Sequence, residues 1–292
     1  MTSTPASIPG GVVPGRRSAT RARGRTVLAT AGLLLAFALI SPYVVMLLTA
    51  LKPDAELRVR PPRIAPIDWQ PGNFADVLGD RAFQSWLRVS LVVAASAMVL
   101  VVVAAVPAAY YTARHRFRGR TTFLFVVLVT QMFSPTALVV GLYRQFFELG
   151  LTSTYAALIL SNAAFNLAFA IWILRAFFVS LPREIEEAAA VDGCGTLGVL
   201  VRVVLPLSLP AIVTALIFTF IAAWNEYIVA LTLMTDAAKY PLTVGITSYV
   251  TAYVQHWNLL FAACIIAIVP VVALFALIEP YLLGGLTAGS VK

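Results

Sequence analysis

Long stretches of apolar residues without charge recur along the chain, separated by short polar links. A helix that crosses the hydrocarbon core of a bilayer needs about 20 such residues. Six stretches reach that length without an Asp, Glu, Lys or Arg, and they cover residues 26–51, 89–113, 121–143, 149–174, 203–225 and 257–278. The pattern therefore predicts an all-α membrane protein with six transmembrane helices.

One further apolar stretch, residues 240–255, is shorter than these six. It carries Pro241 and Gly245 and is rich in Thr, Ser and Tyr, so we predict a re-entrant or surface segment before the last span. Composition agrees with a membrane protein, because 60% of the residues are hydrophobic and the mean hydropathy is +0.89. A chain of this composition has too little polar surface for a soluble globule.

Arginine is concentrated in two places that predict the orientation of the chain. Residues 1–25 form a basic arm without acidic residues or apolar periodicity, which we predict to be disordered. The link between the second and third spans is also basic, and the arginines of the two segments are Arg16, Arg17, Arg21, Arg23, Arg25, Arg114, Arg116, Arg118 and Arg120. Since short basic segments stay on the cytoplasmic side, both termini and the loop of residues 182–204 are expected in the cytoplasm. The net charge of +8 then reflects membrane insertion and requires no nucleic-acid partner.

The residue patterns of an enzyme site are missing from the sequence. Its two cysteines, Cys194 and Cys264, fall at different depths, and its two histidines are not grouped with Cys, Asp or Glu at metal-ligand spacing. No Gly-rich phosphate loop with its lysine occurs. We therefore expect neither an enzyme nor a metal or cofactor bound by this chain. A proton- or sodium-coupled carrier is disfavoured as well, because the six stretches contain no carboxylate.

The loop of residues 182–204 carries a compact pattern of acids, alanines and glycine. Acids at its start favour a short helix, and Gly193 can adopt the positive φ that ends one. At 100° per residue, Ala188 and Ala189 share a face that lets another backbone approach closely, and Glu187 offers a carboxylate to an arginine of a partner protein. A solvated connector between two spans is the alternative.

The spacing of this pattern resembles a known motif. Glu187-Ala188-Ala189 is followed after three residues by Gly193, then after nine more by Val203, and then by Leu205-Pro206. This spacing is similar to the EAA loop of permease subunits in binding-protein-dependent ABC importers, with Val203 in place of the usual isoleucine. In that family the loop is cytoplasmic and couples the permease to an ATPase. The resemblance therefore implies coupling roles for Glu187, Ala188, Ala189, Asp192, Gly193, Leu205 and Pro206.

Three other stretches narrow the resemblance to sugar importers. They are residues 150–155, residues 223–227 and the terminal residues 285–292. Together with the EAA loop they resemble the smaller permease of maltose-type and sn-glycerol-3-phosphate-type systems. The resemblance implies a type I ABC importer permease fold over residues 85–292, preceded by an anchor helix over residues 26–51.

Permeases of that family work as part of a complex in the plasma membrane. The resemblance implies a second, homologous permease, a dimeric cytoplasmic ATPase that binds ATP and Mg, and an extracytoplasmic sugar-binding protein. This chain would then form half of the path for the sugar and bind no cofactor itself. An importer of a solute other than a sugar is the alternative.

Three amide side chains are candidates for the translocation path. Asn162 and Asn166 are spaced i, i+4 and share one helix face, where amides could bind sugar hydroxyls. The same amides could join helices through hydrogen bonds. Gln131 lies close to Ser134 and Pro135, which together predict a kink that could be purely structural.

Aromatic and polar residues near the predicted outer face are candidates for a gate. Trp224, Asn225 and Glu226 come at the end of the fifth span, and Tyr249 and Tyr253 lie in the segment before the sixth. In related permeases a loop at this place contacts the binding protein, so the resemblance implies an outer gate or a binding-protein contact. An aromatic belt at the membrane interface and a plain interfacial helix are the alternatives.

Overall fold

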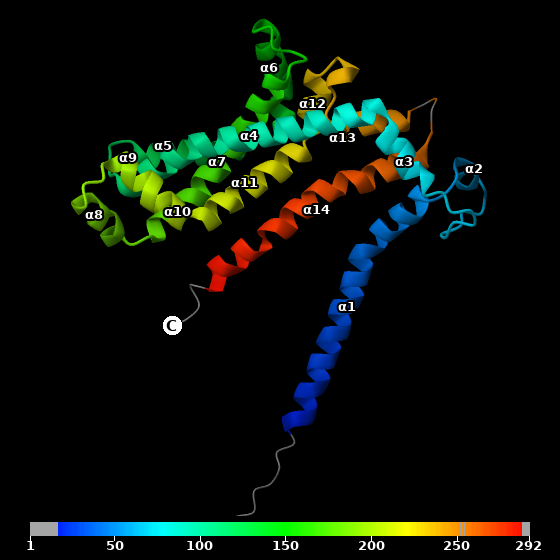
Figure 1. Ribbon diagram of the computed structural model, residues 1–292, viewed down its shortest axis with the longest axis horizontal. Helices are drawn as coiled ribbons and strands as arrows, with labels where there is room; N and C mark the ends of the chain where they lie inside the picture. The colour runs from blue at the N-terminus through cyan, green and yellow to red at the C-terminus, as the bar shows by residue number, and fades with distance from the viewer. Residues whose placement is uncertain (1–16, 252, 254, 288–292) are drawn as a thin grey trace, which may run out of the picture.

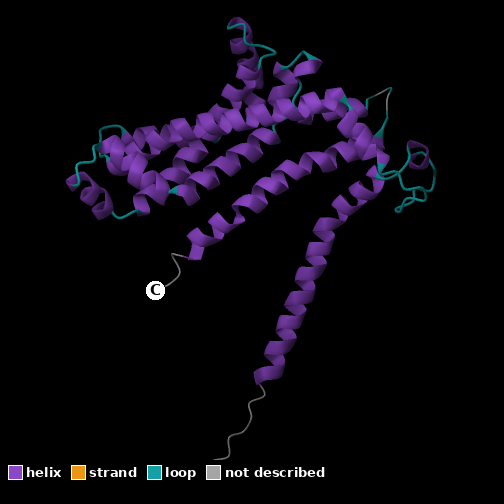
Figure 2. Ribbon diagram, viewed as in Figure 1, coloured by secondary structure: helices purple, strands orange, loops and turns teal. Residues whose placement is uncertain are grey.

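The computed structural model describes residues 17–251, 253 and 255–287, and the side chains of residues 28–277 apart from 252 and 254. Within these residues the chain is helical, and no strand is formed (Figure 2). Four helices lie alongside one another: α4 (Arg81–Arg114), α7 (Tyr155–Ser180), α11 (Leu209–Trp224) and α14 (Trp257–Thr287). Figure 1 shows α8 and α9 at one end of this bundle and α2 and α3 at the other.

The remaining elements connect or flank this bundle. The first is α1 (Arg17–Ala50), which precedes it. The others are α2 (Asp54–Leu57), α3 (Gly72–Gly79), α5 (Arg120–Thr130), α6 (Pro135–Glu148), α8 (Arg183–Val191), α9 (Thr196–Val199), the π-helix η1 (Leu200–Val204), α10 (Leu205–Leu207), α12 (Ile228–Leu233), the 3-10 helix η2 (Ala237–Lys239), α13 (Leu242–Gly245) and the 3-10 helix η3 (Ile246–Tyr249). The all-α prediction is thereby confirmed for the described residues.

Small side chains allow the close packing of α4 against α7. Ala105 and Ala109 of α4 and Ala170 of α7 are all fully buried in one apolar cluster. In a membrane, helices are held together mainly by van der Waals contact, which is strongest where small residues let the backbones approach. The α4–α7 pair is therefore the centre of the bundle.

Two of the six predicted spans are broken helices. Among the described residues, four helices are long and apolar enough to cross a membrane alone, and the number rises to six only if each of two bent pairs counts as one span. Within residues 121–143 the kink predicted near Pro135 is a full break, because α5 and α6 meet at 98° where Pro135 follows a short link. The span predicted over residues 203–225 is bent as well. There the helix that ends at Leu207 meets α11 at 78°, between Pro206 and Pro210.

The disorder predicted for the basic arm does not extend over all of its residues. Residues 1–16 lie outside the described part of the chain, but α1 already begins at Arg17, so the prediction of disorder is wrong for residues 17–25. Arginine and alanine are good helix formers, and the helix of the following apolar stretch can extend backward through them. The anchor helix predicted for residues 26–51 is thus the longer part of α1.

Helix α1 diverges from the bundle and is joined to it at its C-terminal end (Figure 1). The Asn73 side chain donates hydrogen bonds to the carbonyl oxygens of Ala50 and Lys52, at 2.8 and 2.9 Å. The Gln70 N–H donates to the Leu51 carbonyl at 2.8 Å. The rest of the chain buries no residue in the most hydrophobic part of α1.

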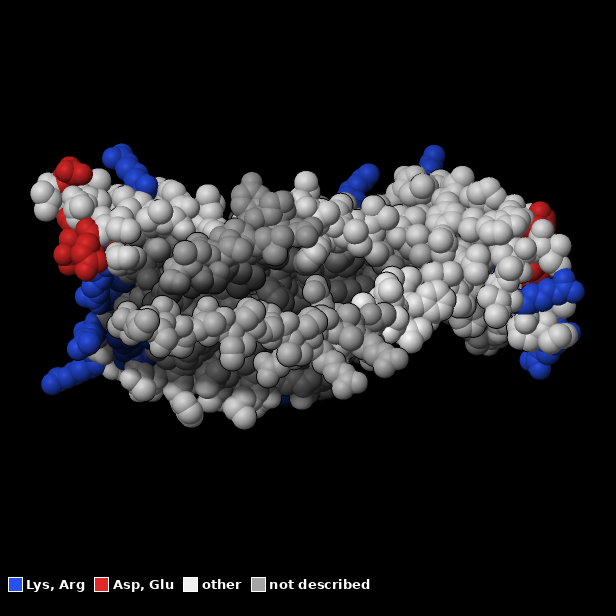
Figure 3. Space-filling view, turned by 90° about the horizontal axis from the view of Figure 1, so that it is seen from below, with Lys and Arg blue, Asp and Glu red and all other residues white. Residues whose placement is uncertain are grey.

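In its described residues, the segment before α14 forms short helices that pack on α4 and no helix of spanning length. The Leu242 N–H donates to the Ser90 hydroxyl at 2.7 Å. A Cβ atom on Gly245 would lie 2.1 Å from the Trp86 ring, so only glycine permits this contact. The view in Figure 3 shows the acidic side chains at the two ends of the molecule, with a largely uncharged surface between them.

Candidate coupling site and translocation path

Helix α8 is an exposed helix with an acidic first turn. Glu184 and Glu186 lie in that turn, where the positive end of the helix dipole stabilises carboxylates. None of its residues is fully buried in this chain. Glu187 and Ala188 are exposed and Ala189 is half-buried, so the alanine face is only partly covered by the bundle.

The helix ends in a turn that requires glycine. Gly193 has a φ of +87°, as its place in the pattern predicted. Its N–H donates to the Ala190 carbonyl at 3.1 Å, and the Cys194 N–H donates to the Ala189 carbonyl at 3.0 Å. This pair of bonds satisfies two carbonyls that a helix end otherwise leaves free. Asp192 is the residue at the end of the helix, directly before this turn.

Replacing Gly193 by alanine is expected to destabilise this turn by about 1–2 kcal/mol, because an L-residue is disfavoured at positive φ. Gly195 is the matched control, since its φ is −69° and a Cβ atom at either position meets nothing within 4 Å. Uptake and thermal stability of the Gly193→Ala and Gly195→Ala variants can be compared directly. Equal behaviour of the two would show that the turn's conformation is not needed.

A buried ion pair ties α8 to the end of α4. Glu186 accepts a hydrogen bond from the Tyr110 hydroxyl at 2.8 Å. Its other carboxylate oxygen lies 2.5 Å from an Arg114 guanidinium nitrogen, and the two side chains are only 8% and 15% exposed for Arg114 and Glu186. Both carboxylate oxygens are thus held by α4.

Two further bonds strengthen this connection. Arg114 also donates to the Leu181 carbonyl at 3.2 Å, and Arg183 donates to the Arg114 carbonyl at 3.3 Å. No sequence pattern predicted the pairing of Glu186 with Arg114. The available signal was weak: of the three glutamates of the loop, Glu186 is the one that lies outside the face shared by Glu184 and Glu187.

The opposite side of α8 is free to meet another molecule. Among the described residues, no cation pairs with Glu187. A hollow of about 390 Å³ lies next to the ion pair, and its lining includes Tyr110, Arg114 and Glu186 as well as Glu187. Helix α8 is therefore fixed on one side by Glu186 and open on the other.

Leu205 and Pro206 lie at the bend between α8 and the bundle. Leu205 is half-buried and Pro206 is exposed. The residues directly before them, Val199, Leu200 and Val204, are buried against α4 and α7. Val199, Leu200 and Val204 thus form a packed elbow, and a movement of α8 would reach α11 through this elbow rather than through a loose linker.

Each of the three amide candidates for the translocation path donates to a backbone carbonyl. The Asn162 side chain is buried and donates to the Leu158 carbonyl of its own helix at 2.9 Å, and Asn166 donates to the Asn162 carbonyl at 2.8 Å. Gln131 lies at the α5–α6 break and donates to the Phe165 carbonyl at 3.0 Å. These bonds favour structural roles: the first two amides back-bond within α7, and the third joins the break to α7.

An apolar cleft opens between α1 and the bundle. Its volume is about 1030 Å³, and its lining comes from α1, α11, α13 and α14. Trp224 and Asn225 belong to this lining. Trp224 is otherwise buried, whereas Asn225 is exposed and donates to the Ile221 carbonyl at 2.9 Å.

Glu226 serves as a cap for α12. Its carboxylate accepts hydrogen bonds from the N–H groups of Val229 at 2.7 Å and Ala230 at 2.9 Å. Burial raises the pKa of Glu226, although these backbone bonds oppose the shift. The carboxylate is thus used within the chain, which leaves its backbone neighbour Asn225 as the more accessible polar group of the predicted gate.

The two tyrosine candidates have opposite environments. The Tyr249 hydroxyl donates to Asp80 at 2.9 Å, and its ring packs edge-on against Trp86. Burial and the bond to Asp80 raise the pKa of Tyr249. Tyr253 is 97% exposed. Only Tyr253 is presented for contact with another molecule.

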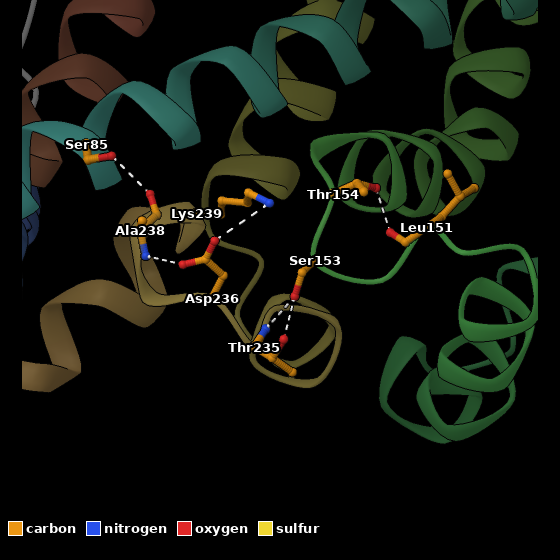
Figure 4. Close-up of polar contacts among 8 residues, drawn as sticks. All are labelled: Ser85, Leu151, Ser153, Thr154, Thr235, Asp236, Ala238 and Lys239. Carbon is orange, nitrogen blue, oxygen red and sulfur yellow. Dashed lines mark hydrogen bonds and ion pairs between the residues drawn. The ribbon is translucent and has the colours of Figure 1, made fainter.

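Polar contacts connect the loops at this end of the molecule (Figure 4). The Ser153 hydroxyl lies 2.6 Å from the Thr235 hydroxyl and also accepts a bond from the Thr235 N–H at 2.9 Å. Ser85 donates to the Ala238 carbonyl at 3.1 Å. These bonds link the start of α7 and the start of α4 to the segment that follows α12.

Comparison with known proteins identifies the family. The sequence profile of the family described as "Binding-protein-dependent transport system inner membrane component" matches residues 103–284. The chain belongs to this family. It is 33% identical over 253 residues to the inner membrane ABC transporter permease protein YcjP of Escherichia coli (strain K12), covering 86% of this chain and 90% of that protein.

Other permeases of the family are similar over most of their length. The trehalose/maltose transport system permease protein MalG of Thermococcus litoralis is 34% identical over 223 residues, which cover 75% of this chain and 80% of that protein. A chain in the crystal structure of a bacterial ABC transporter involved in the import of alginate superposes with a TM-score of 0.79 at 23% identity, covering 92% of this chain and 99% of the other. That likeness confirms the fold.

As a member of this permease family, the chain is a multi-pass component of the cell membrane and is not an enzyme. Its contribution to transport is a set of helices and a path between them. In the part of the chain that the structure describes, no three His, Cys, Asp or Glu side chains are grouped as a metal site would need.

Proposed function

We propose that this chain is a permease subunit of an ATP-driven carbohydrate importer and that α8 receives the force of its ATPase. A second, homologous permease completes the translocation path, and an extracytoplasmic binding protein delivers the solute. ATP and Mg are held by the partner ATPase. The observation that carries the proposal is α8, with Glu187 free on its outer side and Glu186 fixed to α4.

The geometry of α8 suits a coupling element. A partner that contacts Glu187 and Ala188 would move a short helix held at its base by two oxygens of Glu186. That movement would pass to α4 through Arg114 and to α11 through the elbow before Leu205 and Pro206. A solvated connector needs neither the buried ion pair nor the packed elbow.

A carbohydrate as the solute is supported by the relatives. One is a trehalose/maltose permease, and the structural neighbour belongs to an importer of the polysaccharide alginate. Uptake of labelled saccharides, amino acids and short peptides by cells expressing the whole complex tests this part. Uptake of an amino acid or a peptide without any saccharide would overturn it.

The proposed orientation predicts which sites an impermeant thiol reagent reaches in intact cells. In a chain whose Cys194 and Cys264 are replaced by serine, single cysteines at positions 68 and 239 should react from outside. Cysteines at positions 118 and 187 should react only after the membrane is opened. Reaction of position 187 from outside would contradict both the orientation and the coupling role of α8.

A further inference from the structure

An arginine inside α7 pairs with no carboxylate among the residues whose side chains are described. Arg175 is five residues before the end of the helix at Ser180, beyond Leu174, where the sequence-based span stopped. Its Nε atom is shielded from solvent and makes no hydrogen bond. None of the ion pairs among the described residues includes Arg175. An unpaired charge in such a helix is costly, so it points to a function.

Trp172 adds a second unsatisfied donor at the same place. Its Nε1 atom is shielded from solvent and also lacks an acceptor. The Arg175 guanidinium lies 5.8 Å from the centre of the Trp172 ring, within the range of a cation–π contact. The ring thus orients the guanidinium, while both N–H groups remain without an acceptor.

A second arginine lies on the neighbouring helix α5. Arg120 is the first residue of that helix, which contacts α7, and its positive charge acts on Arg175. No described carboxylate pairs with Arg120 either. Two positive charges without a described carboxylate and an indole N–H without a described acceptor thus lie on these two packed helices, which fits an anionic group that offers acceptors only.

We propose that Arg120, Arg175 and Trp172 bind the phosphate of an anionic phospholipid. A phosphate diester matches the planar donors of arginine and carries the missing charge. The surface beside it suits acyl chains, because α5 continues from Arg120 with Phe125, Val126 and Leu128 exposed at 63%, 54% and 49%. Basic groups between helices near the membrane surface commonly bind such headgroups. The assignment to the cytoplasmic leaflet rests on the proposed orientation, whereas the site itself does not.

Lipid bound to the purified complex tests the proposal. The complex is equilibrated with vesicles of equal phosphatidylglycerol and phosphatidylcholine content, extracted again, and its retained lipid is measured by mass spectrometry. The wild type should retain phosphatidylglycerol in excess. Arg120→Gln and Arg175→Gln should each lower this excess roughly fivefold, the effect of one basic residue near an anionic surface. Trp172→Phe, which removes the N–H and keeps a ring, should lower it by less.

Arg118→Gln is the matched control, because Arg118 is an exposed arginine of the same link. An equal loss in the control and in Arg175→Gln, or no preference for phosphatidylglycerol in the wild type, would overturn the proposal. So would displacement of the bound lipid by inorganic phosphate alone, which would identify a site for the free anion.

If Arg175→Gln releases the second permease and leaves the lipid unchanged, the partner is a protein carboxylate and the lipid proposal is wrong. If that variant fails to insert, Arg120→Gln and Trp172→Phe decide. Lipid retention does not depend on the transported solute, so its failure is separable from that of the proposed function.

Discussion

Replacing Glu187 by lysine is expected to lower uptake roughly 100-fold or more, because at the proposed contact with a basic group of the ATPase it would set like charges against each other. Glu187 is exposed and has no cationic partner among the described residues. The change should therefore leave the amount of chain in the membrane unaltered. Uptake by the whole complex and co-purification of the ATPase are the two measurements.

Asp76→Lys is the control for this charge reversal. Asp76 is also an exposed acid, but it lies on α3 at the opposite end of the bundle (Figure 1). A complex with the Asp76→Lys variant should take up the solute at the wild-type rate. Wild-type uptake by both variants would show that α8 does not contact the ATPase through Glu187, and it would restore the interpretation of this loop as a plain connector.

Breaking the buried pair between Arg114 and Glu186 is expected to have the largest effect on stability. Removal of either partner leaves the other charge buried and unpaired, which costs about 3–5 kcal/mol. Arg114→Gln and Glu186→Gln should each lower the thermal midpoint of the purified complex. The double variant should be more stable than the sum of the two losses predicts, because it leaves no unpaired charge.

Tyr110→Phe separates the hydrogen bond from the ion pair. It removes only the hydroxyl that donates to Glu186 and should cost about 1 kcal/mol. Arg183→Gln is a control at an exposed arginine of α8, the helix that carries Glu186. It removes only the single bond to the Arg114 carbonyl. Additive losses for Arg114→Gln and Glu186→Gln would mean that the two side chains do not act as a pair.

Features with local signals could be predicted from the sequence. The short helix after α7 follows from its acids and alanines, and the positive φ of Gly193 follows from its place after the last helical turn. The break near Pro135 was also predicted as a kink, but its angle of 98° was not. A proline shows where a helix is interrupted, while the packing of the neighbouring helices decides how far the chain turns.

The candidates for the gate show the limit of such reasoning. Trp224, Asn225 and Glu226 are adjacent in sequence, yet Trp224 is buried, Asn225 faces an open cleft and Glu226 caps α12. Sequence spacing gave all three the same role. The next helix begins directly after them, and its free N–H groups take up the Glu226 carboxylate.

By itself, the sequence determined the membrane character of this protein, the places of its apolar helices and the exposed helix with its glycine turn, because hydrophobic runs, prolines and caps act over a few residues. Only the tertiary structure decided which charges are satisfied. Arg114 meets Glu186, and Arg175 meets no carboxylate of the described residues, because of how α4, α5, α7 and α8 pack. Helix packing brings together side chains that are far apart in sequence. The spacing of residues along one helix does not show which of them will meet.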